Sequence, residues 1–293
     1  MEFRGAFTAL VTPFKNGKVD EEAYRALIEW QIEQGIDGVV PCGTTGESAT
    51  LSHDEHMKVV SICVDQVKKR VPVIAGAGSN NTKESIELTR HAKEAGADAT
   101  LQITPYYNKP TQEGLVQHYK AIAKEVSIPF VVYNVPSRTA LNLLPKTLAR
   151  MSKEIPEVIG VKEATGDLKQ VSEVVELCGP GFQVLSGDDF TVLPLLAVGG
   201  IGVISVVSNI VPATMAGMCK AFFAGDLVKA RALHYQMSPL NRAMFIETNP
   251  VPVKTSLTLM GKSPSSTVRL PLVQLLPDNE KSLKDTLGKA KLI

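Results

Sequence analysis

The stretch EVIGVKEATG, residues 157–166, joins an apolar, strand-like run to a small polar loop that ends in glycine. Lys162 lies inside the run, among neighbours that give it the near-continuous hydrophobic character of a strand buried on both faces. A lysine that serves only as a solvated surface charge does not need this setting. The stretch therefore predicts a buried parallel strand that carries a candidate functional residue.

Runs of this kind recur along the chain, and each ends in a cluster of Gly, Pro, Ser, Thr or Asn. Together with residues 157–166 they number eight, the others being 6–13, 37–45, 71–78, 97–105, 128–136, 182–189 and 202–209. Apolar residues at three- and four-residue spacing predict helices between them, over 20–34, 53–70, 82–95, 111–126 and 168–178. Ser52 and Asn81 have the character of helix N-caps.

The regular alternation of strands and helices predicts an α/β fold with a parallel sheet covered by helices. Eight such units within about 210 residues are the number that closes a (β/α)8 TIM barrel. An open, doubly wound sheet is the alternative, but six strands would leave two units unexplained. After Val211 the pattern is helical only. We therefore predict a barrel catalytic domain over residues 1–224 and a helical C-terminal extension over residues 225–293.

Composition excludes several classes of partner. Lys and Arg number 31 and Asp and Glu 30, and no basic stripe suited to nucleic acid stands out. The chain shows no signal-peptide pattern and no apolar run long enough to cross a membrane. Its 4 cysteines form no C-x-x-C pair, which argues against a disulfide framework and a zinc site. We expect a cytoplasmic enzyme with a small-molecule substrate.

Active sites of barrels lie at the carboxyl ends of the strands. The residues at these positions are Thr44, Thr45, Tyr106, Tyr107, Tyr133, Arg138, Lys162 and Gly187. Burial disfavours the charged form of a lysine, so an amine at Lys162 that points into the barrel is suited to attack a ketone and form an imine. The alternative is an ion pair of Lys162 with Glu163 at the rim of the barrel.

Three further strand ends fit this chemistry. The phenol of Tyr133 can exchange a proton with a carbinolamine, held by a hydroxyl such as that of Thr44; the alternative is an aromatic core residue. Arg138, in a loop opened by Pro136, can bind a carboxylate with paired hydrogen bonds, unless it is only a solvated surface residue. CGTTGES, residues 42–48, suits an anion or a proton relay but is also typical of a tight turn.

The segments GTTGES, TPYYN, YNVPSRT, IGVKEATG, LSGDD and NPVPVK follow one another over nearly the whole chain and closely resemble those of the dihydrodipicolinate synthase family, also called 4-hydroxy-tetrahydrodipicolinate synthases. The resemblance implies a class I, Schiff-base aldolase-like barrel. It also implies a lyase that condenses pyruvate with L-aspartate 4-semialdehyde in the diaminopimelate route to lysine. Neither a metal nor a cofactor is implied.

The resemblance assigns roles residue by residue. The implied catalytic residues are Lys162, Tyr133, Thr44 and Tyr107, and the implied substrate-binding residues are Thr45, Arg138, Gly187 and Ile204. Lys162 forms the imine, and the other three catalytic residues relay protons. In the family Tyr107 reaches the site of the neighbouring subunit in a tight dimer, which usually pairs again into a homotetramer. Arg138 binds the carboxylate of the aldehyde, while the other three residues hold that of pyruvate.

Lysine-sensitive members of the family bind L-lysine in a separate pocket at the tight-dimer interface. The matching positions here are Ser48, Ala49, His53, His56, Asn80, Glu84 and Tyr106. An imidazole at His56 and a carboxylate at Glu84 suit an amino-acid ligand. The resemblance therefore implies feedback inhibition by L-lysine.

Three alternatives stay open from the sequence. N-acetylneuraminate lyases and keto-deoxy sugar acid aldolases share the lysine and the tyrosine, but more often lack an arginine at the position of Arg138. A barrel that binds ligands without catalysis would not be expected to retain the lysine, both tyrosines and both threonines. The pair of histidines in HDEH, residues 53–56, lacks the H-E-x-x-H order of a metal-dependent hydrolase.

Overall fold

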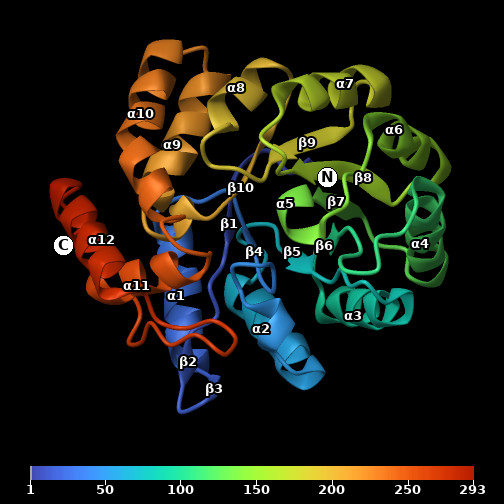
Figure 1. Cartoon of the computed structure of the whole chain (residues 1–293). Helices are drawn as coiled ribbons and strands as arrows, with labels where there is room; N and C mark the ends of the chain where they lie inside the picture. Colours follow the sequence, from blue (N-terminus) through green and yellow to red (C-terminus); the bar gives the residue numbers. More distant parts are fainter. Residues whose placement is uncertain (1) are drawn as a thin grey trace. The chain divides into compact units, whose positions relative to one another are not determined.

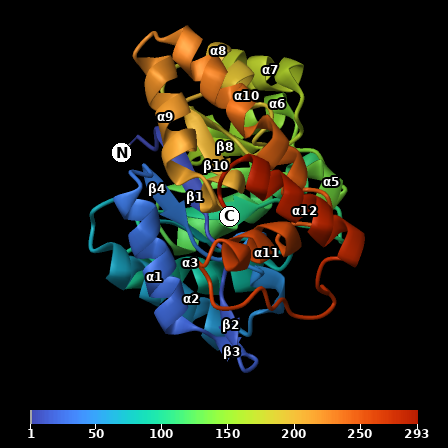
Figure 2. The same ribbon diagram turned by 90° about the vertical axis from the view of Figure 1, so that its left-hand side faces the viewer.

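The computed structural model describes residues 2–293 and divides the chain into two compact units. The first unit consists of Met1–Gly5 and Pro72–Ile204, and the second of Ala6–Val71 and Ser205–Ile293. Figures 1 and 2 show the elements of both units in two views. Each unit is described by itself below.

Six parallel strands run side by side in the first unit, in their order along the chain. They are β5 (Ile74–Gly76), β6 (Ala99–Ile103), β7 (Phe130–Asn134), β8 (Val158–Glu163), β9 (Gln183–Ser186) and β10 (Gly202–Ser205). Most of their residues are buried, as expected of a parallel sheet with helices packed against it. The strand that contains Lys162 is β8, which is paired on both sides.

Helices connect these strands. They are α3 (Thr82–Ala95), α4 (Gln112–Glu125), α5 (Pro136–Thr139), α6 (Pro145–Glu154), α7 (Leu168–Cys178) and α8 (Val192–Ala197). Helices α3, α4, α6 and α7 contact one another in succession and form a row in Figure 1. Their apolar faces bury a core against the strands that includes Leu115, Tyr119, Phe130 and Val161.

The second unit contains the parallel pair β1 (Gly5–Ala9) and β4 (Gly38–Val40) and a short hairpin of β2 (Phe14–Lys15) and β3 (Lys18–Val19). Its helices are α1 (Glu21–Glu33), η1 (Ser48–Thr50), α2 (His53–Val67), η2 (Val207–Asn209), α9 (Pro212–Phe223), α10 (Leu227–Ala243), α11 (Val251–Leu259) and α12 (Pro277–Lys289). Helices α9 and α10 lie side by side in both views. No helix of residues 2–293 combines the length and hydropathy of a membrane span.

The predicted helices agree with the structure, with small differences at their ends. Helix α2 begins at His53 as predicted, with the Ser52 hydroxyl and the Glu55 carboxylate completing a capping box. It ends at Val67, three residues before the predicted end, because Lys68 adopts a left-handed φ of 50°. Arg138, predicted in a loop, lies instead on the one-turn helix α5, which starts with Pro136 as its first residue.

Candidate active site

Lys162 and Tyr133 are neighbours in the sheet of the first unit. In the parallel pair of β7 and β8 these two residues share a register position, and each is only 6% exposed. The Nζ atom of Lys162 lies 4.2 Å from the centre of the Tyr133 ring. The amine and the aromatic ring therefore share one buried face of the sheet.

The amine of Lys162 is poised between its two protonation states. Burial lowers the pKa of Lys162 to about 7, the negative charge of Asp189 opposes this shift, and the positive charge of Arg138 adds to it. Asp189 follows β9 and is 2% exposed. A substantial fraction of the amine is thus neutral near pH 7, which is the form that attacks a carbonyl. The sequence prediction missed Asp189, although it ends one of the eight apolar runs.

Gly187 leaves the space that the Lys162 side chain occupies. A Cβ atom at Gly187 would lie 2.7 Å from Cβ of Ala164 and 3.1 Å from Cε of Lys162. The backbone N–H of Gly187 donates to the carbonyl of Glu163 at 2.7 Å, which keeps the end of β9 close to β8. Any larger residue at this position would overlap with Ala164 and press against the side chain of Lys162.

Glu163 is bound in a hydrogen-bond network of its own. Because successive residues of a strand alternate between faces, its side chain lies on the other face of β8 from Lys162. Its Oε2 atom accepts from the side-chain amides of Asn134 and Gln170, both at 3.0 Å, and its Oε1 atom accepts from the backbone N–H of Thr165 at 2.8 Å. The alternative explanation of Lys162, an ion pair with Glu163, is therefore not what the structure shows.

The same network holds the segment that follows Arg138. The side-chain amide of Asn134 donates to Oδ1 of Asn142 at 2.8 Å, and the backbone N–H of Leu143 donates to Oδ1 of Asn134 at 2.9 Å. Arg138 itself is exposed at the surface of α5. Arg138 therefore lies close in the chain to a segment that this network holds, and its own side chain is accessible to a ligand.

Thr44 and Thr45 belong to the second unit, in the turn that follows β4. Backbone hydrogen bonds close this turn, from Gly46 N–H to the Gly43 carbonyl and from Glu47 N–H to the Thr44 carbonyl, both at 3.1 Å. Thr45 is buried and Thr44 is partly accessible. The structure thus confirms that CGTTGES forms a tight turn, in which Thr45 is buried and Thr44 partly accessible.

The positions matched to lysine-sensitive relatives fall in both units. In the first unit the side-chain amide of Asn80 donates to the Tyr106 carbonyl at 3.1 Å, and the hydroxyl of Ser79 donates to the Glu84 carboxylate. In the second unit His56 is buried in α2 and His53 is exposed at its start, while Ser48 and Ala49 form η1. Ile204, another implied site residue, is buried in β10.

Tyr107 differs from every other predicted site residue in its setting. It is 90% exposed and its φ is 70°, a left-handed conformation that is uncommon for a residue with a bulky side chain. The neighbouring Asn108 donates from its side-chain amide to the Asn80 carbonyl at 2.9 Å, which anchors the loop. A large aromatic side chain therefore projects from the surface on a loop that this hydrogen bond anchors.

The rate at which pyruvate becomes attached to the protein is expected to rise with pH, with a midpoint near 7. Only the neutral amine attacks the ketone, and the amine becomes neutral as the pH rises through the lowered pKa of Lys162. Brief incubation with pyruvate followed by borohydride, from pH 5 to pH 11, measures this midpoint. Asp189→Asn is expected to move it to lower pH, since the charge of Asp189 raises the pKa. A midpoint near the ordinary lysine value of 10.5 would contradict the assignment.

A buried, partly neutral lysine beside a tyrosine on parallel strands is characteristic of α/β enzymes that bind a keto compound as an imine. Residues 2–290 match the sequence profile of the dihydrodipicolinate synthetase family, and the chain belongs to this family.

Individual relatives match over the full length. A 4-hydroxy-tetrahydrodipicolinate synthase of Nitratidesulfovibrio vulgaris is 70% identical over 293 residues, 100% of both chains. A crystal structure of a dihydrodipicolinate synthase is 51% identical with a TM-score of 0.97, covering 99% of this chain and 100% of its own. The enzyme of Cyanidioschyzon merolae, crystallised with lysine bound, is 38% identical with a TM-score of 0.96 over 100% of both chains.

These comparisons confirm three predictions made from the sequence: the family, the class of fold and the class of enzyme. The fold is an α/β barrel of eight parallel strands with additional C-terminal helices, and the enzyme is a lyase of the 4-hydroxy-tetrahydrodipicolinate synthase type. The alternative activity, that of a sugar-acid aldolase, has no support among these relatives.

Proposed function

We propose that the protein condenses pyruvate with L-aspartate 4-semialdehyde through an imine at Lys162. The observation that carries this proposal is the buried amine of Lys162, with a pKa of about 7, in contact with the ring of Tyr133. The amine adds to the keto carbon of pyruvate, and loss of water gives the imine. Loss of a proton from the methyl carbon gives an enamine, which forms the new carbon–carbon bond with the aldehyde.

Each remaining site residue has a proposed part in these steps. Tyr133, Thr44 and Tyr107 move protons to and from the carbinolamine, and Tyr107 acts in the site of a partner subunit. The exposure and rigid backbone of Tyr107 support this second part. Thr45 and the main chain at Gly187 and Ile204 bind the carboxylate of pyruvate. Exposed Arg138 binds the carboxylate of the aldehyde with its planar guanidinium.

The proposed assembly is a homotetramer made of two tight dimers, acting in the cytoplasm without a cofactor. We also propose the division into a barrel domain over residues 1–224 and a helical extension over residues 225–293. The boundary coincides with the turn at Gly225 between α9 and α10, where φ is 80°. This division follows the order of the chain and does not coincide with the two compact units.

L-lysine is the proposed inhibitor, bound by Ser48, Ala49, His53, His56, Asn80, Glu84 and Tyr106. The Glu84 carboxylate is suited to the ammonium group of an amino acid, and the relative from Cyanidioschyzon merolae carries lysine. Asn80 ties this group to the Tyr106 carbonyl, one residue before Tyr107. Lysine bound here would therefore act on the segment that carries a proposed catalytic tyrosine.

A coupled assay with pyruvate and aspartate semialdehyde tests the proposed function. Millimolar L-lysine is expected to lower the initial rate, and Glu84→Gln is expected to raise the inhibitory concentration about tenfold or more, because a charged hydrogen bond is lost. Glu87→Gln on the same helix is the matched control and should leave inhibition unchanged. Unchanged rates with lysine would contradict the proposed inhibition. Turnover of a sugar acid but not of the semialdehyde would contradict the proposed substrate.

A further inference from the structure

Thr45 receives a hydrogen bond from Asn249, a residue just before helix α11 and 204 positions away in the chain. The Nδ2 atom of Asn249 lies 3.0 Å from Oγ1 of Thr45, and the two residues are 5% and 2% exposed. A hydroxyl group has one proton to donate and two lone pairs to accept with. Because Asn249 occupies a lone pair of Thr45, the proton of this hydroxyl is left for a different acceptor.

We propose that Asn249 is a positioning residue for the keto-acid substrate, which makes the Thr45 hydroxyl an obligate donor toward the substrate carboxylate. The inference rests on the proposed function, in which Thr45 binds that carboxylate. An ionised carboxylate only accepts hydrogen bonds, so a hydroxyl fixed as a donor is its matching partner. Without Asn249, the Thr45 hydroxyl could turn its proton to other acceptors of the turn.

Within the residues that the structure describes, the side chain of Asn249 makes no hydrogen bond other than the one to Thr45. Its Oδ1 atom is buried without a hydrogen-bond partner among residues 2–293, and the one hydrogen bond of its side chain is to Thr45. Burying an amide group with so few hydrogen-bond partners costs free energy. This cost suggests that the amide is kept for its hydrogen bond to Thr45. A residue that only filled space here would not need an amide.

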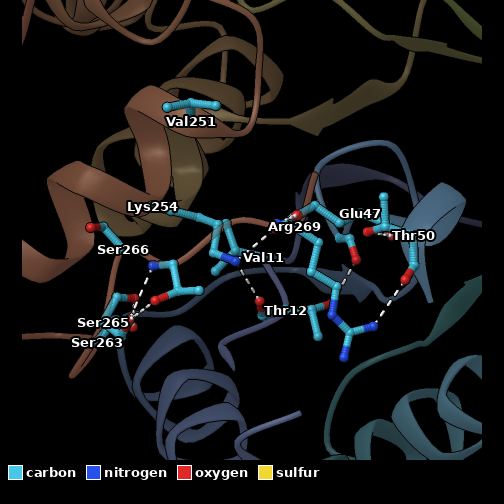
Figure 3. A network of polar contacts seen from close by, with 12 residues as sticks. Val11, Thr12, Glu47, Thr50, Val251, Lys254, Ser263, Ser265, Ser266 and Arg269 are labelled. Carbon is cyan, nitrogen blue, oxygen red and sulfur yellow. Dashed lines mark hydrogen bonds and ion pairs between the residues drawn. The ribbon is translucent and has the colours of Figure 1, made fainter. Parts of the chain in front are cut away.

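A second contact connects the same turn to helix α11, which begins two residues after Asn249 (Figure 3). The Nζ atom of Lys254, on α11, lies 2.6 Å from Oε1 of Glu47 and donates to the Thr12 carbonyl at 2.8 Å. Both charged side chains are 1% exposed. Desolvation lowers the pKa of Lys254, and the nearby charge of Glu47 offsets only part of this shift.

Arg269 closes this network from the other side. Its backbone N–H donates to Oε2 of Glu47 at 3.0 Å, and its guanidinium donates to both carboxylate oxygens of Glu55 at 2.6 Å and to the Thr50 carbonyl at 2.9 Å. Figure 3 shows Glu47, Lys254 and Arg269 close together in this network. Both carboxylate oxygens of Glu47 are thus engaged, and the turn after β4 cannot move independently of the C-terminal segment.

The hydrogen bond from Asn249 and the ion pair of Lys254 together hold the Thr45 side chain in one orientation. Thr45 and Glu47 are two residues apart in the turn, and of their partners Asn249 lies two residues before helix α11 and Lys254 lies within it. One bond alone would allow the turn to pivot, whereas two fix both the position and the direction of the Thr45 side chain. The C-terminal segment thereby takes part in substrate recognition.

The test is a double-mutant cycle of Asn249→Ala with Thr45→Val, repeated with Thr45→Ser, which keeps a hydroxyl. In the wild-type background, Asn249→Ala is expected to raise the KM for pyruvate about tenfold, because one hydrogen bond to a charged group is weakened. The kcat and the KM for the aldehyde should change little. The same substitution should change the KM for pyruvate by less than about twofold beside Thr45→Val, and again by several-fold beside Thr45→Ser.

Two results would overturn the inference. One is an equal rise in the KM for pyruvate beside Thr45→Val and beside Thr45→Ser, because Asn249 would then act independently of the hydroxyl. The other is a parallel loss of kcat and of aldehyde binding, which marks a general structural role. If Asn249→Ala does not fold, Asn249→Ser takes its place in the cycle. Failure of the proposed function is distinguished by trapping with borohydride, since the wild-type protein would then form no adduct with pyruvate.

Discussion

Lys162→Ala is expected to abolish the borohydride-trapped adduct with pyruvate and to lower kcat/KM by about four orders of magnitude or more. Without the amine there is no atom to form the imine, and the enamine that attacks the aldehyde cannot arise. The substitution should leave the fold intact. Burial disfavours the charged form of Lys162 and lowers its pKa, so removing the amine also removes an unfavourable burial of charge. Trapping with radiolabelled pyruvate, together with circular dichroism, measures both outcomes.

Arg138→Ala is the matched control for this experiment. Arg138 is exposed on α5 and is proposed to bind only the aldehyde, so its loss should leave the adduct with pyruvate nearly intact while use of the aldehyde falls. If Lys162→Ala retained the adduct, the imine would have to be at a different lysine. If Arg138→Ala abolished the adduct as well, the division of the two carboxylates between different residues would be wrong.

Tyr133→Phe is expected to lower kcat by about two to four orders of magnitude, the contribution of a positioned general acid and base. The ring of Tyr133 lies 4.2 Å from the amine and is buried, so phenylalanine should fill the same space and remove only the hydroxyl. The KM for pyruvate should change much less than kcat, because the proton transfers occur after binding. Steady-state kinetics and the rate of adduct formation separate these two effects.

Tyr119→Phe offers the same chemical change without the proposed role. Tyr119 is fully buried in the core of the first unit, where its hydroxyl donates to the Gln102 carbonyl at 3.4 Å. Loss of that hydrogen bond is expected to lower the free energy of unfolding by about 1 kcal/mol and to leave kcat unchanged. A decrease in kcat of less than threefold in Tyr133→Phe would contradict the assignment of Tyr133 as a proton donor and acceptor.

Much of the fold could be predicted from the sequence because its signals are local. Apolar runs buried on both faces and helices with three- and four-residue spacing are read from neighbouring residues, and Ser52 capped α2 as predicted. Lys162 was found by the same means, because it lies inside an apolar run where a surface lysine is not expected. The hairpin of β2 and β3 was missed, since two strands of two residues leave no periodicity to read.

The parts of the site that were missed depend on distant contacts. Asn249 meets Thr45 across 204 residues of sequence, and no local pattern marks that pair. The partners of Glu163 were missed for the same reason, since Asn134 and Gln170 lie on other elements, although alternation along a strand already places Glu163 and Lys162 on opposite faces. Asp189 was visible as an acidic residue after an apolar run, but its effect on the pKa of Lys162 follows from the neighbouring strand.

Peptide mapping of the unchanged protein after incubation with pyruvate and borohydride tests the central claim most directly. The account predicts one modified peptide, with the reduced pyruvate adduct on the side chain of Lys162 and every other lysine unmodified. An adduct on a different lysine, or none on any peptide, would contradict it.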